Sequence, residues 1–318
     1  MHSKDEHGVA SPPDVAHSER LKPRIAVEEY FARSGRTLRK TGARLWYERH
    51  IKTPLLKAAI KSLGTYSRGV RNALRPRVRN LRLGFDDLPA AFHGFRILHI
   101  GDLHIDEMDG LSEALVPVLS GLKADACVLT GDYRFEFSGP CYRVYPRMQT
   151  VLSCISAPYG CFGILGNHDA AEMVGRLEAM GVRMLINEAV AIEKGNSALW
   201  IAGLDDSFDY RCDDLPGTMA EIPPHGFKIL LTHTPDVYEQ AAAQRIDLYL
   251  CGHTHAGQIR LPAIGAIKKN ARAPRRYIQG HWRHNGMHGY TTWGAGCSTL
   301  PVRLNCPPEV AVIELRRN

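Results

Sequence analysis

The segment Cys251-Gly252-His253-Thr254-His255-Ala256-Gly257-Gln258 follows directly on the mainly apolar run 246–250. Alternate residues of a strand point to the same side, so the two imidazoles converge on one site if the extended geometry persists. This is an arrangement of metal ligands. A lone His-x-His pair is more often a surface turn with two solvated histidines, because short motifs carry many false positives. The rest of the chain decides between these interpretations.

Four further strands are predicted to end in polar residues of the same kind. Buried strands are indicated by the apolar runs at 95–100, 126–130, 161–165 and 227–232. The residues that follow them are Asp102 with His104, Asp132, Asn167-His168-Asp169, and His233. Strands alternating with helical patterns indicate a layered α/β fold, in which ligands gather at the carboxyl ends of the strands.

The predicted strand ends supply carboxylates, imidazoles and an amide, with no thiolate. This donor set suits a divalent ion such as manganese, iron or zinc. The set is too large for one tetrahedral ion, and it fits a pair of ions bridged by a carboxylate, which can clamp both oxygens of a phosphoryl transfer. Any one of these residues alone is more simply a cap or a satisfied core group, but five such strand ends make that interpretation remote.

The ordered motifs resemble those of the calcineurin-like metallophosphoesterase superfamily over about residues 95–318. They are Asp102-Leu103-His104, Gly131-Asp132, Gly166-Asn167-His168-Asp169, His233 and Gly252-His253-Thr254-His255. The continuation through Pro262 and the segment 290–309 resemble the membrane-associated YkuE- and YaeI-like subgroup, which includes UDP-2,3-diacylglucosamine pyrophosphatases. The resemblance implies a four-layer αββα sandwich and hydrolysis by water activated between two ions.

The resemblance also implies a role for each motif residue. One ion would be held by Asp102, His104 and His255, the other by Asn167, His233 and His253, with Asp132 bridging them. His168 would face the substrate, where it would stabilise developing charge or protonate the leaving oxygen. Asp169 would orient His168 or a ligand. Manganese is the favoured metal, with iron or zinc as alternatives.

Three positions depart from the pattern of the superfamily. Gly101 stands where serine is frequent, and Ala256 replaces a glycine. The stretch 133–136 replaces one that often carries an aspartate, and Glu136 is a candidate to substitute for it beside Asp132. None of these departures removes a predicted ligand.

The net charge of +7 is unevenly distributed along the 318 residues. Residues 33–82 contain fifteen Lys or Arg and one acid, Glu48. We predict an N-terminal extension over residues 1–82, disordered at 1–23 and then amphipathic and helical, with Gly35 and Pro54 dividing the helices, and a catalytic domain over residues 83–318. The basic helical part could bind an anionic membrane surface, bind nucleic acid, or pack on the catalytic domain.

Targeting signals are not evident in the sequence. The first 23 residues lack an apolar core of the kind found in secretory signals, and no apolar run approaches the roughly 18 residues of a membrane span. Eight irregularly spaced cysteines indicate reduced thiols. These features predict a cytoplasmic protein that is peripheral on the inner face of the membrane and is not secreted.

The prediction that follows is a dinuclear metal-dependent phosphoester hydrolase. Its favoured substrate is a lipid-linked or nucleotide-sugar diphosphate such as UDP-2,3-diacylglucosamine. A basic run is predicted either to grip a second phosphate or to be a solvated loop, and contains Lys268, Lys269, Arg272, Arg275, Arg276 and Arg283. Two alternative functions stay open: a broad-specificity phosphodiesterase or nuclease, and a non-catalytic membrane adaptor that retains the fold.

Overall fold

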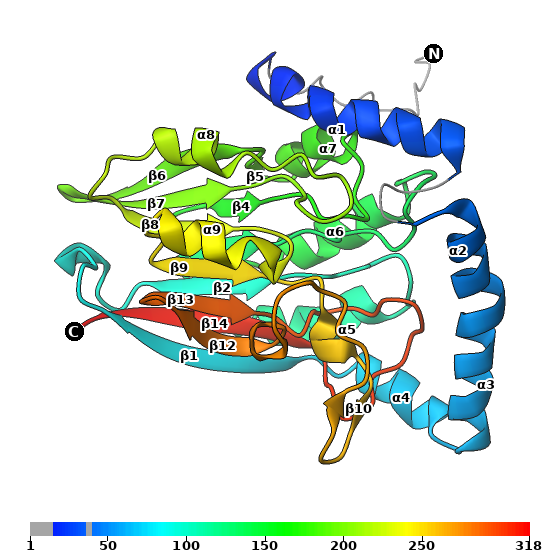
Figure 1. Cartoon of the computed structure of the whole chain (residues 1–318). Coiled ribbons are helices and arrows are strands. Elements are labelled where there is room, and N and C mark those ends of the chain that lie inside the picture. The colour runs from blue at the N-terminus through cyan, green and yellow to red at the C-terminus, as the bar shows by residue number, and fades with distance from the viewer. Residues whose placement is uncertain (1–14, 36–39) are drawn as a thin grey trace, which may run out of the picture.

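The computed structural model describes residues 15–35 and 40–318, and over these residues it contains two six-stranded sheets (Figure 1). The first sheet has the order β1 (Arg77–Phe85), β14 (Glu309–Arg317), β2 (Arg96–Ile100), β3 (Ala126–Leu129), β4 (Cys161–Gly163), β5 (Val182–Met184). The second has the order β12 (Gly280–His284), β13 (Met287–Thr291), β9 (Leu248–Cys251), β8 (Phe227–Leu231), β7 (Ser197–Gly203), β6 (Glu188–Lys194). All pairings within the two sheets are parallel except β14 with β2, β12 with β13, and β6 with β7.

Helices cover the outer face of each sheet. The first sheet packs against α5 (Leu111–Leu119), α6 (Val144–Leu152) and α7 (Met173–Ala179). The second packs against α8 (Leu215–Ala220) and α9 (Tyr238–Ala243). A third apolar cluster lies between the two sheets. The predicted four-layer αββα sandwich is therefore confirmed.

The apolar runs in the sequence follow from this layering. In β2, Ile97 joins the core between the sheets, while Leu98 and Ile100 join the core beneath the helices. In β3, Val128 and Leu129 divide in the same way. Both faces of each inner strand are covered by other layers. Side chains on either face are therefore buried, and these strands are apolar throughout and do not alternate with polar residues.

The remaining elements are short. They are the hairpin of β10 (Arg260–Leu261) and β11 (Gly265–Ala266), and the 3₁₀ helices η2 (Ala90–Phe92), η3 (Pro235–Val237), η4 (His255–Gly257) and η5 (Arg275–Tyr277). All eight cysteines are free thiols. None of the helices among the described residues combines the length and apolar character needed to cross a bilayer.

The N-terminal extension is more ordered than its sequence indicates. It forms α1 (Val15–Ser34), α2 (Gly42–Tyr47), the π-helical turn η1 (Glu48–Lys52), α3 (Thr53–Ser62) and α4 (Tyr66–Ala73). The predicted disorder is thus wrong for residues 15–23, and residues 1–14 lie outside the described residues. Pro54 does not interrupt the helix, because it lies in the first turn of α3, where proline is tolerated. The predicted boundary at residue 82 falls within β1, a strand of the first sheet.

A buried arginine attaches α1 to the body of the protein. Arg24 is fully buried and forms an ion pair with Asp205, and its Nη2 donates to the carbonyl oxygens of Gly166 and Asp169 at 2.6 and 2.7 Å. Its guanidinium also lies 3.9 Å from the ring centroid of Tyr210. A charged group is buried in this way only where partners replace its hydration. The extension therefore contributes a residue to the interior of the domain.

We expect Arg24→Met to lower the free energy of unfolding by about 3–5 kcal/mol, because Asp205 would stay buried without its partner. The matched control is Arg33→Met, which removes an exposed pair with Glu29 and should change stability by less than about 1 kcal/mol. Urea denaturation followed by circular dichroism measures both changes. Equally small effects would show that Arg24 does not anchor α1.

Candidate metal centre

Five strand ends bring the seven predicted metal ligands together. All seven are buried: Asp102, His104, Asp132, Asn167, His233, His253 and His255. Five of them have φ between +38° and +68°, namely Asp102, His104, Asp132, His253 and His255. Such a backbone conformation costs about 1–3 kcal/mol for a residue with a side chain and persists only where surrounding contacts impose it. Five of the seven ligands are thus held in a strained backbone conformation.

The first group of ligands consists of Asp102, His104 and His255, whose ligand atoms lie within 4.8 Å of one another. The Nε2 atoms of the two histidines are 3.2 Å apart, and Oδ1 of Asp102 is 3.9 Å from Nε2 of His255. The amide of His253 donates to Oδ1 of Asp102 at 2.7 Å. The other carboxylate oxygen, Oδ2, is buried and has no hydrogen-bond partner within the part of the chain that the structure describes.

The second group consists of Asn167, His233 and His253. Oδ1 of Asn167 lies 3.0 Å from Nε2 of His233 and 2.9 Å from Nδ1 of His253, and these two nitrogens are 3.1 Å apart. Nδ1 of His233 donates to the carbonyl oxygen of Thr130 at 2.8 Å, so in the neutral ring Nε2 offers only a lone pair. The amide nitrogen of Asn167 donates to Asp209 at 2.9 Å, which directs Oδ1 toward the histidines.

Asp132 connects the two groups through a single oxygen. Its Oδ2 lies 3.5 Å from Nε2 of His104 and 3.2 Å from Nε2 of His233. Its Oδ1 accepts the backbone N–H of His168 at 2.9 Å, which fixes the carboxylate in place. One oxygen shared between two sets of ligands is the arrangement of a bridging carboxylate.

These contacts fit a pair of divalent cations. Lone pairs on oxygen and nitrogen converge in both groups, and buried acceptors repel one another unless a cation lies between them. Separations of about 3–4 Å are those of atoms that bind a shared ion at about 2.0–2.2 Å. The unpartnered Oδ2 of Asp102 is a further acceptor that an ion would satisfy. Carboxylate, imidazole and amide donors suit manganese, iron or zinc.

The electrostatics of the site also favour a positive charge. Burial disfavours charge on His233, yet the neighbouring Asp132 carboxylate raises the pKa of His233 to about 10. Burial raises the pKa of Asp102 to about 6 and lowers those of His253 and His255 well below their usual value. A bound cation would therefore displace a proton from His233.

Comparison with known proteins places this geometry in a family. Residues 95–257 match the family model described as calcineurin-like phosphoesterase. The chain belongs to the calcineurin-like phosphoesterase family. It is 32% identical to phosphodiesterase YaeI of Escherichia coli over 70% of this chain and 82% of the relative. It is 30% identical to metallophosphoesterase YkuE of Bacillus subtilis over 72% of this chain and 82% of the relative.

A more distant relative has a named substrate. UDP-2,3-diacylglucosamine pyrophosphatase LpxG of Chlamydia trachomatis is 27% identical over 60% of this chain and 73% of its own length. The predicted family and the predicted hydrolase class are therefore confirmed, and the family uses divalent metal ions.

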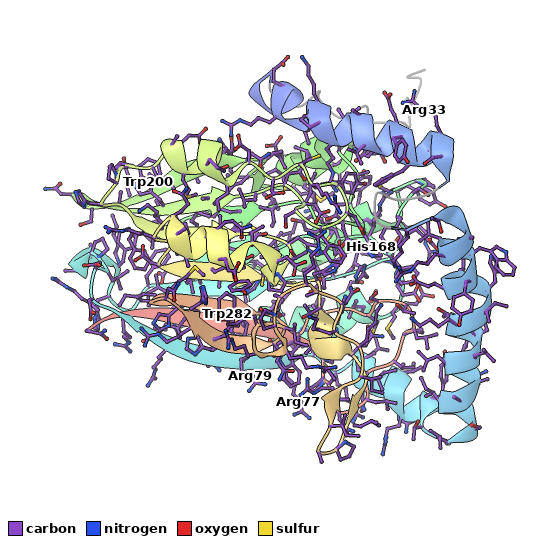
Figure 2. All side chains as sticks on the ribbon, viewed as in Figure 1. Arg33, Arg77, Arg79, His168, Trp200 and Trp282 are labelled. Carbon is purple, nitrogen blue, oxygen red and sulfur yellow. The ribbon has the colours of Figure 1, made fainter. Side chains whose placement is uncertain are left out.

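In this phosphoesterase, His168 lies at the border of the candidate metal centre. A ligand atom of its ring is within 4.8 Å of those of His104 and Asp132, and the ring stacks on Phe137 with centroids 3.8 Å apart. Its Nδ1 donates to the carbonyl oxygen of Phe135. Burial lowers the pKa of His168 to about 3, so the ring is neutral at neutral pH. Figure 2 shows His168 on the same side of the molecule as α2 and α3.

Asp169 acts on the main chain around the bridging carboxylate. Its Oδ2 accepts the amides of Asp132 and Gly166, each at 2.7 Å. Its Oδ1 accepts the amides of Tyr133 and Arg134 at 2.8 and 3.4 Å. The carboxylate thus holds the loop after β3 against the loop after β4, and positions Asp132 through its backbone.

The structure explains the first of the three departures from the family pattern and describes the surroundings of the other two. A Cβ on Gly101 would lie 2.4 Å from Oγ1 of Thr130, so a serine does not fit here without a shift. Ala256 has φ +49°, a conformation that glycine adopts more readily. Glu136 does not replace the missing aspartate, because it is exposed and pairs with Arg49 at 3.6 Å.

Three polar contacts of the ligands were not predicted. Asn270 lies 3.1 Å from Nε2 of His253, Arg303 lies 3.0 Å from Nδ1 of His255, and Asp209 binds Asn167. Asp209 follows β7, a parallel neighbour of β8, so the strand-end rule could have found it. Asn270 lies 17 residues beyond His253 in the chain, and Arg303 lies 48 residues beyond His255. No pattern in the sequence around either residue predicts these contacts.

The basic run is largely peripheral. Arg272, Arg275, Arg276 and Arg283 are exposed. Lys268, however, lines a cavity that also contains His255. The exposure of the four arginines therefore favours a solvated loop, and Lys268 lines a cavity beside the metal centre.

We expect Asp169→Asn to weaken manganese binding by about 10–100-fold, because the new amide group would face backbone N–H donors and displace Asp132. Calorimetric titration of the metal-free protein with Mn²⁺ measures the effect. Glu136→Gln, an exposed change in the adjacent loop, is the control and should bind as the native protein does. Unchanged affinity in a folded Asp169→Asn protein would contradict the role of Asp169.

Proposed function

We propose that this protein hydrolyses phosphodiester or diphosphate bonds with two divalent ions, manganese being favoured. The proposal rests on the shared Oδ2 of Asp132, which lies 3.5 and 3.2 Å from histidines of the two ligand groups. Asp102, His104 and His255 would hold one ion, and Asn167, His233 and His253 the other. Such ions, when bound, stabilise charge on the phosphoryl oxygens and lower the pKa of water.

The chain itself would orient the phosphoryl group. His168 lies beside His104 and Asp132, and its stacking on Phe137 and its bond to the Phe135 carbonyl fix the plane of the ring. A neutral ring held in this way would contact a substrate oxygen without moving. Asp169 would act indirectly, by holding the main chain of Asp132.

The favoured substrate is a lipid-linked or nucleotide-sugar diphosphate such as UDP-2,3-diacylglucosamine. The likeness to the Chlamydia trachomatis pyrophosphatase supports this choice. The exposed apolar and basic side chains of the extension, described below, give further support.

We expect the manganese-loaded protein to release UMP from UDP-2,3-diacylglucosamine in preference to cleaving bis(4-nitrophenyl) phosphate. His253→Ala should lower kcat/KM by at least about a hundredfold, since the ions contribute several kcal/mol of transition-state stabilisation. His225→Ala, which changes an exposed histidine in a loop, should retain the native rate.

Full activity of His253→Ala with bound metal would refute the site assignment. Aryl cleavage alone would keep the metal site and redirect the substrate search to nucleotides or nucleic acids. No cleavage of either compound by metal-loaded protein would favour the non-catalytic adaptor.

We further propose that the extension binds the inner face of the membrane peripherally. The continuous helical column α2–η1–α3 is mostly exposed, and Trp46 and Tyr47 expose 58% and 51% of their surface. Lysines and arginines on the same column would be attracted to anionic lipid. Figure 1 shows the column along one side of the molecule.

We expect Lys57→Gln with Lys61→Gln to weaken binding to anionic vesicles by about thirtyfold, at about 1 kcal/mol for each basic residue. Removing charges from edge strands with Lys194→Gln and Arg283→Gln is the control and should leave binding unchanged. Cosedimentation of the full chain measures both. Deletion of residues 1–82 is unsuitable, because it removes Arg24 and most of β1. Equal binding by both double variants would contradict the membrane proposal.

A further inference from the structure

A cavity of about 420 Å³ lies between the N-terminal extension and the candidate metal centre. Its volume is within the range of about 300–1,000 Å³ typical of small-molecule sites. Its lining includes His255, a predicted metal ligand, and Asn270, whose amide lies 3.1 Å from His253. The cavity therefore adjoins the candidate metal centre, where a phosphoryl group would be bound.

Apolar surface makes up most of the cavity wall. Leu56 of α3 lines one side, and Ile259, Ile267 and Leu300 line the others. Lys52, Lys268 and Glu48 also line the cavity, and Glu48 is paired with Lys40 at 2.7 Å, so the two lysines provide positive charge for an anionic group. A site of this composition takes a hydrocarbon chain joined to an anion.

The inner wall is held rigidly. The side chain of Gln258 donates to the carbonyl oxygens of Ser298 and Leu300 and accepts the amide of Ser298, at distances of 2.7 to 2.8 Å. The outer wall is attached at one end, where Ile60 of α3 packs against Leu300 and Val302. The cavity is thus a formed feature of the fold, and the extension closes it.

The lining argues against a nucleobase as the occupant. Apart from His255, no aromatic side chain lines this cavity among the described residues. Sites for single-stranded nucleic acid rely on aromatic side chains for base stacking. Aliphatic side chains such as Leu56 and Ile267 offer a nucleobase no stacking partner.

We propose that this cavity is a subsite for an aliphatic chain of the phosphoester substrate, with α3 of the extension as its outer wall. The inference rests on the proposed hydrolase function and adds the place in the fold where the aliphatic part of the substrate binds. The phosphoryl group lies at the metal centre, and the chain extends from it past His255 between Leu56 and Ile267. Lys52 and Lys268 lie beside the anionic part.

The test compares methyl and octyl esters of 4-nitrophenyl phosphate, each below its micelle concentration and with manganese-loaded full-length protein. Water adds to phosphorus, the bond to the nitrophenyl oxygen breaks, nitrophenolate leaves and one proton is released. We expect kcat/KM for the octyl ester to exceed that for the methyl ester by at least about tenfold, through a lower KM.

Matched variants locate the subsite. Leu56→Ser should reduce the octyl-to-methyl ratio about fivefold, and Leu55→Ser should not change it. The two leucines are adjacent and 38% and 64% exposed, and only Leu56 lines the cavity. Ile267→Ser and Ile264→Ser form a second such pair on the opposite wall, since both are exposed and only Ile267 lines this cavity. A native ratio near one, or equal effects within both pairs, would overturn the inference while the hydrolase function stands.

A binding measurement tests the subsite without turnover. Calorimetry should show octyl phosphate binding at least about tenfold more tightly than methyl phosphate, with the difference reduced in Leu56→Ser. If neither ester is hydrolysed, the proposed function is decided by UDP-2,3-diacylglucosamine instead, and this comparison still decides whether the cavity takes an aliphatic chain. Equal affinity for octyl phosphate and methyl phosphate would overturn the proposed subsite for an aliphatic chain.

Discussion

The buried acceptors around Asp132 are the constraint on which the rest of this structure depends. Two carboxylates, an amide oxygen and four imidazoles meet with lone pairs about 3–4 Å apart. Left without cations, these groups repel one another in a medium where water cannot screen them. Folding therefore places them so closely only at a free-energy cost, and bound cations would offset that cost. Strained backbone at five of the seven ligands adds to it.

Hydrogen bonds to the main chain hold the loops that carry the ligands. Asp169 accepts four backbone amides and so joins the loops after β3 and β4. Arg24 of α1 donates to two carbonyl oxygens of the same β4 loop. The loop that carries Asn167 and His168 is thus held both by a carboxylate and by a guanidinium. A ligand geometry that depends on strained residues is stable only with such a second layer of contacts.

Much of this arrangement is predictable from local sequence because strand and ligand adjoin along the chain. The apolar runs before Asp102, Asp132, Asn167, His233 and His253 all form strands, and their ends meet as the strand-end rule requires. The contacts of Asn270 and Arg303 are not predictable, since they depend on how distant loops fold back. The helix over residues 15–23 was missed for a related reason. It is stabilised by the burial of Leu21 and Arg24 against the domain, which its polar sequence does not reveal.

The extension is consequently not a separate unit attached to a catalytic domain. Its first helix supplies Arg24 to the loop that carries Asn167, while its third supplies Leu56 to the cavity that contains His255. Its last residues form part of β1, which pairs with β14 in the first sheet. A membrane contact made by the exposed column α2–η1–α3 would thus occur on the outer wall of the cavity. Movement of α3 at the membrane would alter the cavity directly, because the same helix would make the membrane contact and form the outer wall of the cavity.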